Sequence, residues 1–210
     1  MIRLLIADDH PIVREGLKRI IAECTDIQLV GEAVNGEEVL DLCSKLEIDV
    51  ILLDISMPGP GFIDILNRLE LKYPLLRILV LSMHSEDHYA IRAIKAGAEG
   101  YLTKNHSPEE LATAIRHVYR GNKYVTPSLA ERLASMLNAK TDNPLHETLS
   151  NREYQILCLI GSGNDTRDIA SKLSLSPKTI STYRTRIFDK MGFKANSELI
   201  RYALEHNLVE

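Results

Sequence analysis

The chain has 210 residues, of which 45% are hydrophobic and 26% charged, and its formal net charge is -4 at pH 7. These proportions are typical of a water-soluble globular protein, and the length leaves room for two ordinary domains. No apolar segment reaches the roughly 20 residues of a membrane-spanning helix. The short apolar run at the start leads directly into Asp8 and Asp9, which argues against a signal peptide. We therefore expect a cytoplasmic protein without a membrane segment.

The cysteines and histidines predict neither a disulfide framework nor a zinc site. Cys24, Cys43 and Cys158 are odd in number and far apart, and each lies in an apolar helical pattern, so we expect buried, reduced thiols. Several histidines lie near predicted strand ends, but they are not spaced as the ligands of a metal cage are. We assign no ligand role to His10, His84, His88 and His106.

Apolar runs and helical patterns alternate through roughly the first 120 residues. The runs predict strands at 2–7, 28–33, 49–54, 78–81 and 101–103. The helical patterns predict helices that begin near Pro11, Gly36, the end of the 58–61 loop, Asp87 and Ser107. The run 49–54 has no polar alternation, as in a strand buried on both faces. This alternation predicts one doubly wound α/β domain with a five-stranded parallel sheet.

Polar residues stand where successive strands of this sheet end. Asp8 and Asp9 follow the first strand, and Asp54, Ser82 and Lys104 end or follow the third, fourth and fifth. In a parallel sheet these ends share one edge, which is where ligands bind. Because three close carboxylates are unfavourable without a cation, we expect a hard divalent ion there, most simply Mg²⁺.

Each of these residues also has a simpler interpretation. Asp8 or Asp9 is a suitable cap for the helix that follows, Ser82 a turn residue, and Lys104 a solvated loop lysine. Taken together they fit a phosphoryl-transfer site. Asp54 is then the nucleophile, and the metal, Ser82 and Lys104 act on the phosphoryl oxygens.

Five short motifs of this first part of the chain carry a family resemblance: Asp8-Asp9-His10, Asp54 with Met57-Pro58, Ser82-Met83, Lys95-Ala96-Gly97-Ala98 and Gly100-Tyr101-Leu102-Thr103-Lys104. They resemble the receiver domain of a bacterial two-component response regulator, over residues 1 to about 120. The resemblance implies that Asp54 accepts a phosphoryl group from a sensor histidine kinase or a phosphotransfer protein.

The same resemblance implies roles for the neighbours of Asp54. Asp9 and Asp54 would bind Mg²⁺ directly, helped by the backbone carbonyl of Ser56, while Asp8 would act largely through water. Ser82 and Tyr101 would be a switch pair, with the hydroxyl drawn to the phosphate and the ring turning inward. A homodimer is expected on phosphorylation.

The character of the sequence changes after residue 121. Residues 127–137 fit a short helix, whereas 138–148 have too little apolar content to pack. We therefore predict a receiver domain at 1–121, a linker with a short helix at 122–148, and a second domain at 149–210.

The segment 149–210 is predicted to be small and all-α. Ser150 and Glu153 form a capping box for its first helix, a second covers 166–173, Ser176 and Pro177 begin a third, and a fourth opens at 196. Two short helices joined by a tight turn fit a helix-turn-helix. Nine lysines and arginines against seven acids leave this segment at +2 and the rest at -6, so only this segment suits a polyanion.

The third helix has two unlike faces. At 100° per residue, four residues share the face that must be buried: Ile180, Tyr183, Ile187 and Met191. The other side carries small hydroxyl residues framed by charge: Lys178, Ser181, Thr182, Thr185, Arg186 and Asp189. A solvated face is the simpler interpretation, but hydroxyls suit base edges and cations suit phosphates.

Three stretches of this segment, at 149–153, 168–170 and 176–180, resemble the LuxR-type C-terminal domain. With the receiver they imply a response regulator of the NarL/FixJ subfamily. Carried over by position, the residues facing bases would be Ser181, Thr182 and Thr185. Those facing the DNA backbone would be Lys178, Thr179 and Arg186.

The resemblance implies a phosphorylation-controlled transcriptional regulator that binds double-stranded promoter DNA and is not an enzyme. Two alternatives remain open. One is a phosphatase or phosphotransferase that turns over an aspartyl phosphate, and the other is a scaffold whose output is protein binding. Salt-dependent binding to DNA distinguishes the regulator from both.

Overall fold

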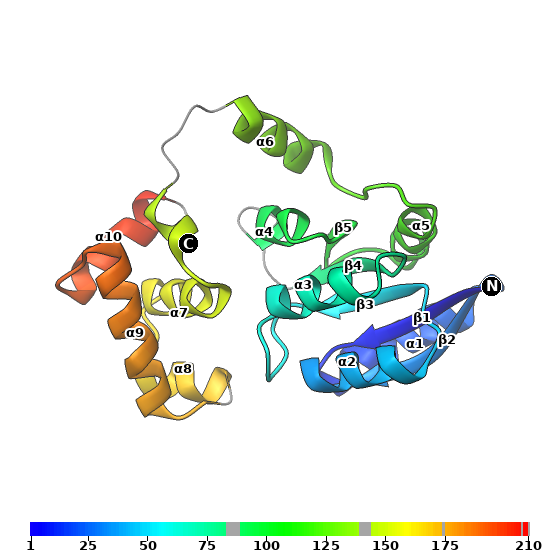
Figure 1. Cartoon of the computed structure of the whole chain (residues 1–210), viewed down its shortest axis with the longest axis horizontal. Coiled ribbons are helices and arrows are strands. Elements are labelled where there is room, and N and C mark those ends of the chain that lie inside the picture. Colours follow the sequence, from blue (N-terminus) through cyan, green and yellow to red (C-terminus); the bar gives the residue numbers. More distant parts are fainter. Residues whose placement is uncertain (83–88, 139–143, 174, 207, 210) are drawn as a thin grey trace. The chain divides into compact units, whose positions relative to one another are not determined.

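The computed structural model describes residues 1–82, 89–138, 144–173, 175–206 and 208–209, and Figure 1 traces the chain. Two compact units are present, residues 1–138 and 139–210. The division falls inside the segment predicted as a linker, and the exact domain boundaries stay a prediction. Within the described ranges, no helix combines the length and the apolar character that a bilayer crossing requires.

The first unit contains a five-stranded sheet in the order β2-β1-β3-β4-β5, and all neighbouring strands are parallel. The strands are β1 (Ile2–Ala7), β2 (Ile27–Ala33), β3 (Val50–Asp54), β4 (Arg77–Ser82) and β5 (Gly100–Thr103). Every residue of β3 is buried, as expected for a strand covered on both faces. The predicted doubly wound α/β architecture is confirmed.

Helices cover both faces of this sheet. They are α1 (Pro11–Ala22), α2 (Gly36–Lys45), α3 (Phe62–Lys72), α4 (Tyr89–Lys95) and α5 (Pro108–Tyr119). The buried sides of α1 and α5 share one core with β1, β3 and β4, whereas α3 packs beside α2 and α4. The side chains of Asn35 and Ser107 accept hydrogen bonds from the first turns of α2 and α5, which fixes where these helices begin.

The prediction for the cysteines is only partly right. Cys43 is buried, and this burial raises the pKa of its thiol to about 11. Cys24 and Cys158 are only half-buried, and Cys24 lies beyond the last residue of α1, Ala22. None of the three forms a disulfide bond.

The chain after α5 returns to the sheet before it leaves the first unit. The Tyr124 N–H donates to the Glu99 carbonyl (2.8 Å), and its carbonyl accepts from the Tyr101 N–H (3.2 Å). The next helix, α6 (Pro127–Asn138), lies against α4 and buries Leu129. The first part of the predicted linker is therefore bonded to the edge of β5.

The second unit is all-α, as predicted. It contains the 3₁₀ turn η1 (Leu145–Thr148) and the helices α7 (Asn151–Gly161), α8 (Thr166–Lys172), α9 (Pro177–Met191) and α10 (Asn196–Glu205). Ser150 and Glu153 form the expected capping box of α7, and Ser176 caps α9 with Pro177 in its first turn.

One expectation about the linker is wrong. We expected residues 138–148 not to pack, but His146 is buried, and its Nδ1 lies 3.0 Å from the hydroxyl of Tyr202 on α10. The His146 ring also lies beside that of Tyr154, with centroids 5.9 Å apart. A single histidine thus anchors a polar segment, which counts of apolar residues do not reveal. Residues 139–143 lie outside the described ranges.

Candidate phosphoacceptor site and nucleic-acid interface

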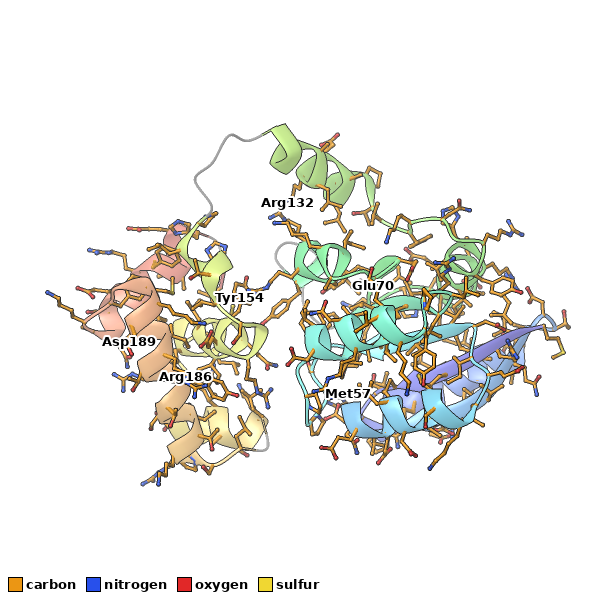
Figure 2. The ribbon with its side chains drawn as sticks, in the orientation of Figure 1. Met57, Glu70, Arg132, Tyr154, Arg186 and Asp189 are labelled. Carbon is orange, nitrogen blue, oxygen red and sulfur yellow. The ribbon has the colours of Figure 1, made fainter. Side chains whose placement is uncertain are left out.

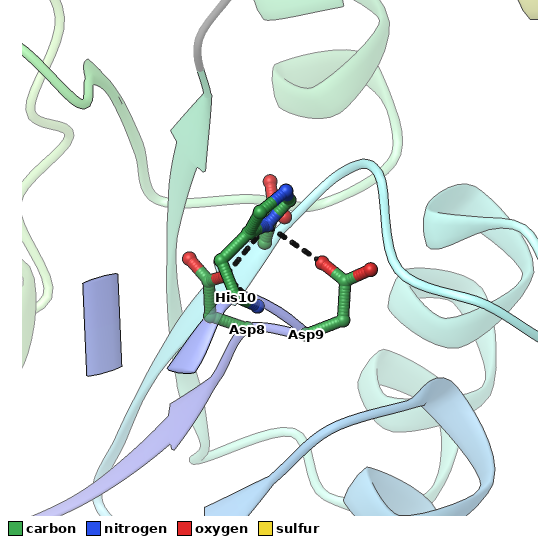
Figure 3. A group of neighbouring side chains, drawn as sticks. Asp8, Asp9 and His10 are labelled. Atoms are coloured by element: carbon green, nitrogen blue, oxygen red, sulfur yellow. Dashed lines mark hydrogen bonds and ion pairs between the residues drawn. The ribbon is translucent and has the colours of Figure 1, made fainter. Parts of the chain in front are cut away.

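Four side chains converge at the carboxyl ends of β1 and β3. Asp8, Asp9 and His10 follow β1, and Asp54 ends β3, which pairs with β1 along Leu4–Ala7. One potential ligand atom from each lies within 4.8 Å of all the others. Asp8 and Asp54 are only 1% and 2% exposed. The structure therefore brings together the three predicted carboxylates and a histidine. Figure 3 shows Asp8, Asp9 and His10 of this group.

Neither aspartate of the pair is the cap of α1. His10 occupies the N-cap position and makes no capping bond through its side chain. One oxygen of Asp8 instead accepts the His10 backbone N–H at 2.8 Å. The simpler interpretation of Asp8 and Asp9 as helix caps is thus wrong.

Lys104 is an internal cation of this site. Its Nζ lies 2.6 Å from Asp8 Oδ2 and 3.0 Å from Asp54 Oδ2, and its side chain is only 5% exposed. Its backbone N–H donates to the Ser82 carbonyl at 2.7 Å, which ties the end of β5 to that of β4. The interpretation of Lys104 as a solvated loop residue is therefore wrong.

Opposing effects act on the Asp54 carboxyl group. Burial raises its pKa, the Lys104 ammonium lowers it, and the negative charge of Asp8 raises it again. A hydrogen bond from the Ser56 backbone also lowers it, and the net result is a pKa above the ordinary value of 3.8. A further cation at this site would favour the ionised form of the Asp54 carboxyl group.

The donor set fits a hard divalent cation. Asp8 Oδ2, Asp9 Oδ1 and Asp54 Oδ2 are buried, and beyond the ion pairs with Lys104 and His10 they have no hydrogen-bond partner among the described residues. Lys104 supplies one positive charge against three carboxylates. Carboxylate oxygens grouped in this way are the ligands that Mg²⁺ prefers.

The two predicted switch residues are buried in the first unit. Ser82 is the last residue of β4, Tyr101 is the second of β5, and neither side chain is exposed. Strand β5 pairs with β4 so that Tyr101 lies opposite Val80. The ring of Tyr101 is therefore buried, which is the inward orientation that the resemblance implies for it.

Two functional-site neighbours, Arg14 and His10, are not assigned by the sequence analysis. Arg14, one turn into α1, donates from its guanidinium to the Asp8 carbonyl (2.8 Å) and lies 3.5 Å from Glu32. His10 points its Nδ1 at both neighbouring aspartates. The position of His10 directly after two acids in the sequence is the signal that could have identified it.

The other histidines near the predicted strand ends do not join this site among the described residues. His106 turns its Nδ1 to the Thr103 carbonyl (2.8 Å), and His84 and His88 lie outside the described residues.

In the second unit, α9 presents one buried and one exposed face. Ile180, Ile187 and Met191 are buried, as predicted. Tyr183 is only half-buried, so its expected full burial is wrong: it lies at the edge of the apolar face, with the Arg186 guanidinium 5.8 Å from its ring centroid. The proposed DNA-facing residues Lys178, Ser181, Thr182, Thr185 and Arg186 are exposed, and Thr179 is half-buried. Figure 2 shows Arg186 and Asp189 on this helix.

The hydroxyl groups of this exposed face bond to their own helix. Ser181, Thr182 and Thr185 each donate to the carbonyl four residues earlier, at 3.0–3.1 Å. The hydroxyl hydrogens are therefore used, and the oxygen lone pairs and threonine methyl groups remain for a partner. Such groups suit amino donors and thymine methyls on base edges.

Internal polar contacts hold α8 and α9 in place. Asp165 caps α8 by accepting the backbone N–H groups of Arg167 and Asp168. Glu153 of the capping box also accepts from Lys190 of α9 at 2.7 Å. Burial acts to raise the pKa of Glu153, but Lys190 and Ser150 outweigh it and lower that pKa.

Comparisons with known proteins agree with this two-part organisation. A family model described as "Response regulator receiver domain" matches residues 4–116, and one described as "Bacterial regulatory proteins, luxR family" matches 147–203. Response regulator GacA of Pseudomonas aeruginosa is 39% identical over 212 residues, which cover 100% of this chain and 99% of GacA. Response regulator UvrY of Escherichia coli is 37% identical over 210 residues, covering 99% and 96%.

Solved structures of another regulator resemble the whole chain. RcsB of Salmonella typhimurium, from a study of conformational dynamism for DNA interaction, matches with a TM-score of 0.66 and 28% identity and covers 98% of both chains. A structure of an RcsB–DNA complex matches with a TM-score of 0.60 and 27% identity and covers 96% of both chains.

Proposed function

This chain belongs to the response regulators of the NarL/FixJ group, with a receiver domain and a LuxR-type DNA-binding domain, and on that premise we propose that Asp54 is its phosphoacceptor. The observation that carries the proposal is the placement of Asp54: it ends the central strand β3, nearly buried, 3.0 Å from Lys104 and beside two further carboxylates.

The reaction is a transfer from a phosphohistidine of a sensor kinase or phosphotransfer protein. An Asp54 oxygen attacks phosphorus, the donor P–N bond breaks with its electron pair leaving on the imidazole, and an acyl phosphate forms. The Lys104 ammonium is placed to meet the charge on the phosphoryl oxygens. Ser82, at the end of the neighbouring strand, is proposed to donate to the same oxygens.

Receiver domains typically bind Mg²⁺ at an acidic pocket. Here Asp9, Asp54 and the Ser56 backbone carbonyl are proposed to hold the ion directly, and Asp8 through water. Bound there, it supplies positive charge that offsets the phosphoryl oxygens and the carboxylates. Asp8 and Lys104, paired at 2.6 Å, orient each other beside it.

The proposed output is DNA binding by α9. Lys178, Thr179 and Arg186 are proposed to contact phosphates, and Ser181, Thr182 and Thr185 the base edges. The supporting observations are the exposure of this face over a buried core and the similarity to a regulator solved in complex with DNA. Phosphorylation is proposed to act through Ser82 and Tyr101 and to favour a homodimer that occupies two half-sites.

The phosphoacceptor is tested by intact-mass measurement after incubation with acetyl phosphate and Mg²⁺. Wild type should gain one phosphoryl group, and Asp54→Asn should gain none because the amide is no nucleophile. Asp9→Ala should react poorly because a metal ligand is missing. Asp64→Asn, an exposed aspartate on α3, is the matched control and should react as wild type does. A full adduct on Asp54→Asn would reject the assignment.

A further inference from the structure

His10 directs an imidazole nitrogen into the acidic site. Its Nδ1 lies 2.9 Å from Asp9 Oδ1 and 3.2 Å from Asp8 Oδ1, the two contacts drawn in Figure 3. The side chain is 58% exposed, whereas that of Asp8 is 1% exposed. The imidazole therefore stands on the solvent side of a site whose carboxylates are largely enclosed.

The backbone of His10 is held in place next to Asp8. His10 is the N-cap of α1 in an extended conformation, and its N–H bonds to Asp8 Oδ1. Arg14, from the first turn of the same helix, holds the Asp8 carbonyl. These bonds place His10 relative to Asp8 whatever its ring does.

The distances suit neighbouring ligands of one ion. Two ligand atoms that bind a metal at about 2.1 Å and at about 90° to each other are about 3.0 Å apart. The distance between His10 Nδ1 and Asp9 Oδ1, 2.9 Å, is of this size, and one potential ligand atom each from Asp9, His10 and Asp54 lies within 4.8 Å of the others.

A nitrogen ligand changes which ion the site prefers. Mg²⁺ and Mn²⁺ favour oxygen ligands, whereas imidazole favours Co²⁺, Ni²⁺ and Zn²⁺. We propose that His10 is a metal ligand through Nδ1, so that the phosphoacceptor site also takes these nitrogen-preferring ions and binds them more tightly than Mg²⁺. This rests on the proposed function insofar as a divalent ion binds at Asp9 and Asp54.

The competing explanation is a hydrogen bond or ion pair between the imidazole and the two carboxylates. Such a pair would position the carboxylates in the same way whichever divalent ion binds. It therefore predicts no discrimination between Co²⁺ and Mn²⁺ beyond that of an oxygen-only site.

The test is titration of the tag-free full-length protein with Co²⁺ and with Mn²⁺, by calorimetry and, for Co²⁺, by its visible absorption spectrum. We expect His10→Ala to lower the ratio of Co²⁺ to Mn²⁺ affinity by about tenfold or more. The cobalt bands should shift as a nitrogen ligand is lost. His106→Ala is the matched control: it removes a histidine beyond β5 whose Nδ1 faces a backbone carbonyl, and it should leave the ratio unchanged.

The other possible results of these titrations each contradict one of the two proposals, either the role of His10 or the placement of the ion. An unchanged ratio and spectrum in His10→Ala would overturn the assignment of His10, as would cobalt binding that survives Asp9→Ala. Wild-type phosphorylation with Mg²⁺ would stand in both cases. If Asp9→Ala instead binds Mn²⁺ and is phosphorylated as wild type, the proposed placement of the ion fails as well.

Discussion

At the scale of single residues, the environment of Asp54 makes its negative charge unfavourable for folding. Burial, opposed in part by Lys104, raises its pKa, so the folded state holds the proton more tightly than the unfolded state. Its contribution to stability is therefore present below the ordinary pKa of 3.8 and is lost as the pH rises through the raised value.

This gives a prediction for the unphosphorylated protein in EDTA. Asp54→Asn should unfold at a higher temperature than wild type near neutral pH, because the amide carries no buried charge. The difference should shrink as the pH is lowered toward about 4. Thermal unfolding followed by circular dichroism at several pH values checks it, with exposed Asp189→Asn as the control. A gain independent of pH would mean that packing, not charge, is responsible.

At the scale of elements, we expect different residues of α9 to determine the affinity for DNA and the specificity for its sequence. Lys178→Ala and Arg186→Ala should weaken binding to every duplex and lower the salt slope by about one unit each. Thr182→Ala and Thr185→Ala remove no charge, so they should cost about 1–3 kcal/mol on the specific site and little on scrambled DNA. Titrations on both duplexes at several salt concentrations measure this.

The folding control for α9 must be a buried residue. Tyr183 is only half-buried and therefore unsuitable. Ile187 is fully buried, so Ile187→Ala should cost about 2–5 kcal/mol of unfolding free energy. If the threonine variants stay folded and weaken both duplexes equally, a different face of α9 lies against the DNA.

The order of strands and helices was predictable because apolar runs and helical spacing are local signals. The convergence of Asp8, Asp9 and Asp54 followed as well, since parallel strands bring their carboxyl ends to one edge. The packing of His146 was not predictable, because its partner Tyr202 is 56 residues away. The directions of Arg14 and His10 depend on side-chain rotamers, which residue spacing does not fix.

At the scale of the whole molecule, phosphorylation should change the state of association. Negative charge added at Asp54 can rearrange the side chains of Ser82 and Tyr101, which lie on strands β4 and β5. That rearrangement can alter the nearby helical surface. Analytical ultracentrifugation should show a larger dimer fraction for the phosphorylated wild type than for Asp54→Asn treated alike. Equal sedimentation over a wide concentration range would contradict this.

The hydrogen bonds between Tyr124 and the edge of β5 also determine which truncated fragments of the first unit should stay soluble. β5 is an edge strand, and Tyr124 satisfies the N–H of Tyr101 and the carbonyl of Glu99. A Cβ added to Gly100 would lie 2.8 Å from the Tyr124 carbonyl oxygen, so only glycine permits this approach. A fragment ending at residue 121 exposes that edge, and we expect it to aggregate by strand addition, whereas one ending at 138 should stay monodisperse in light scattering.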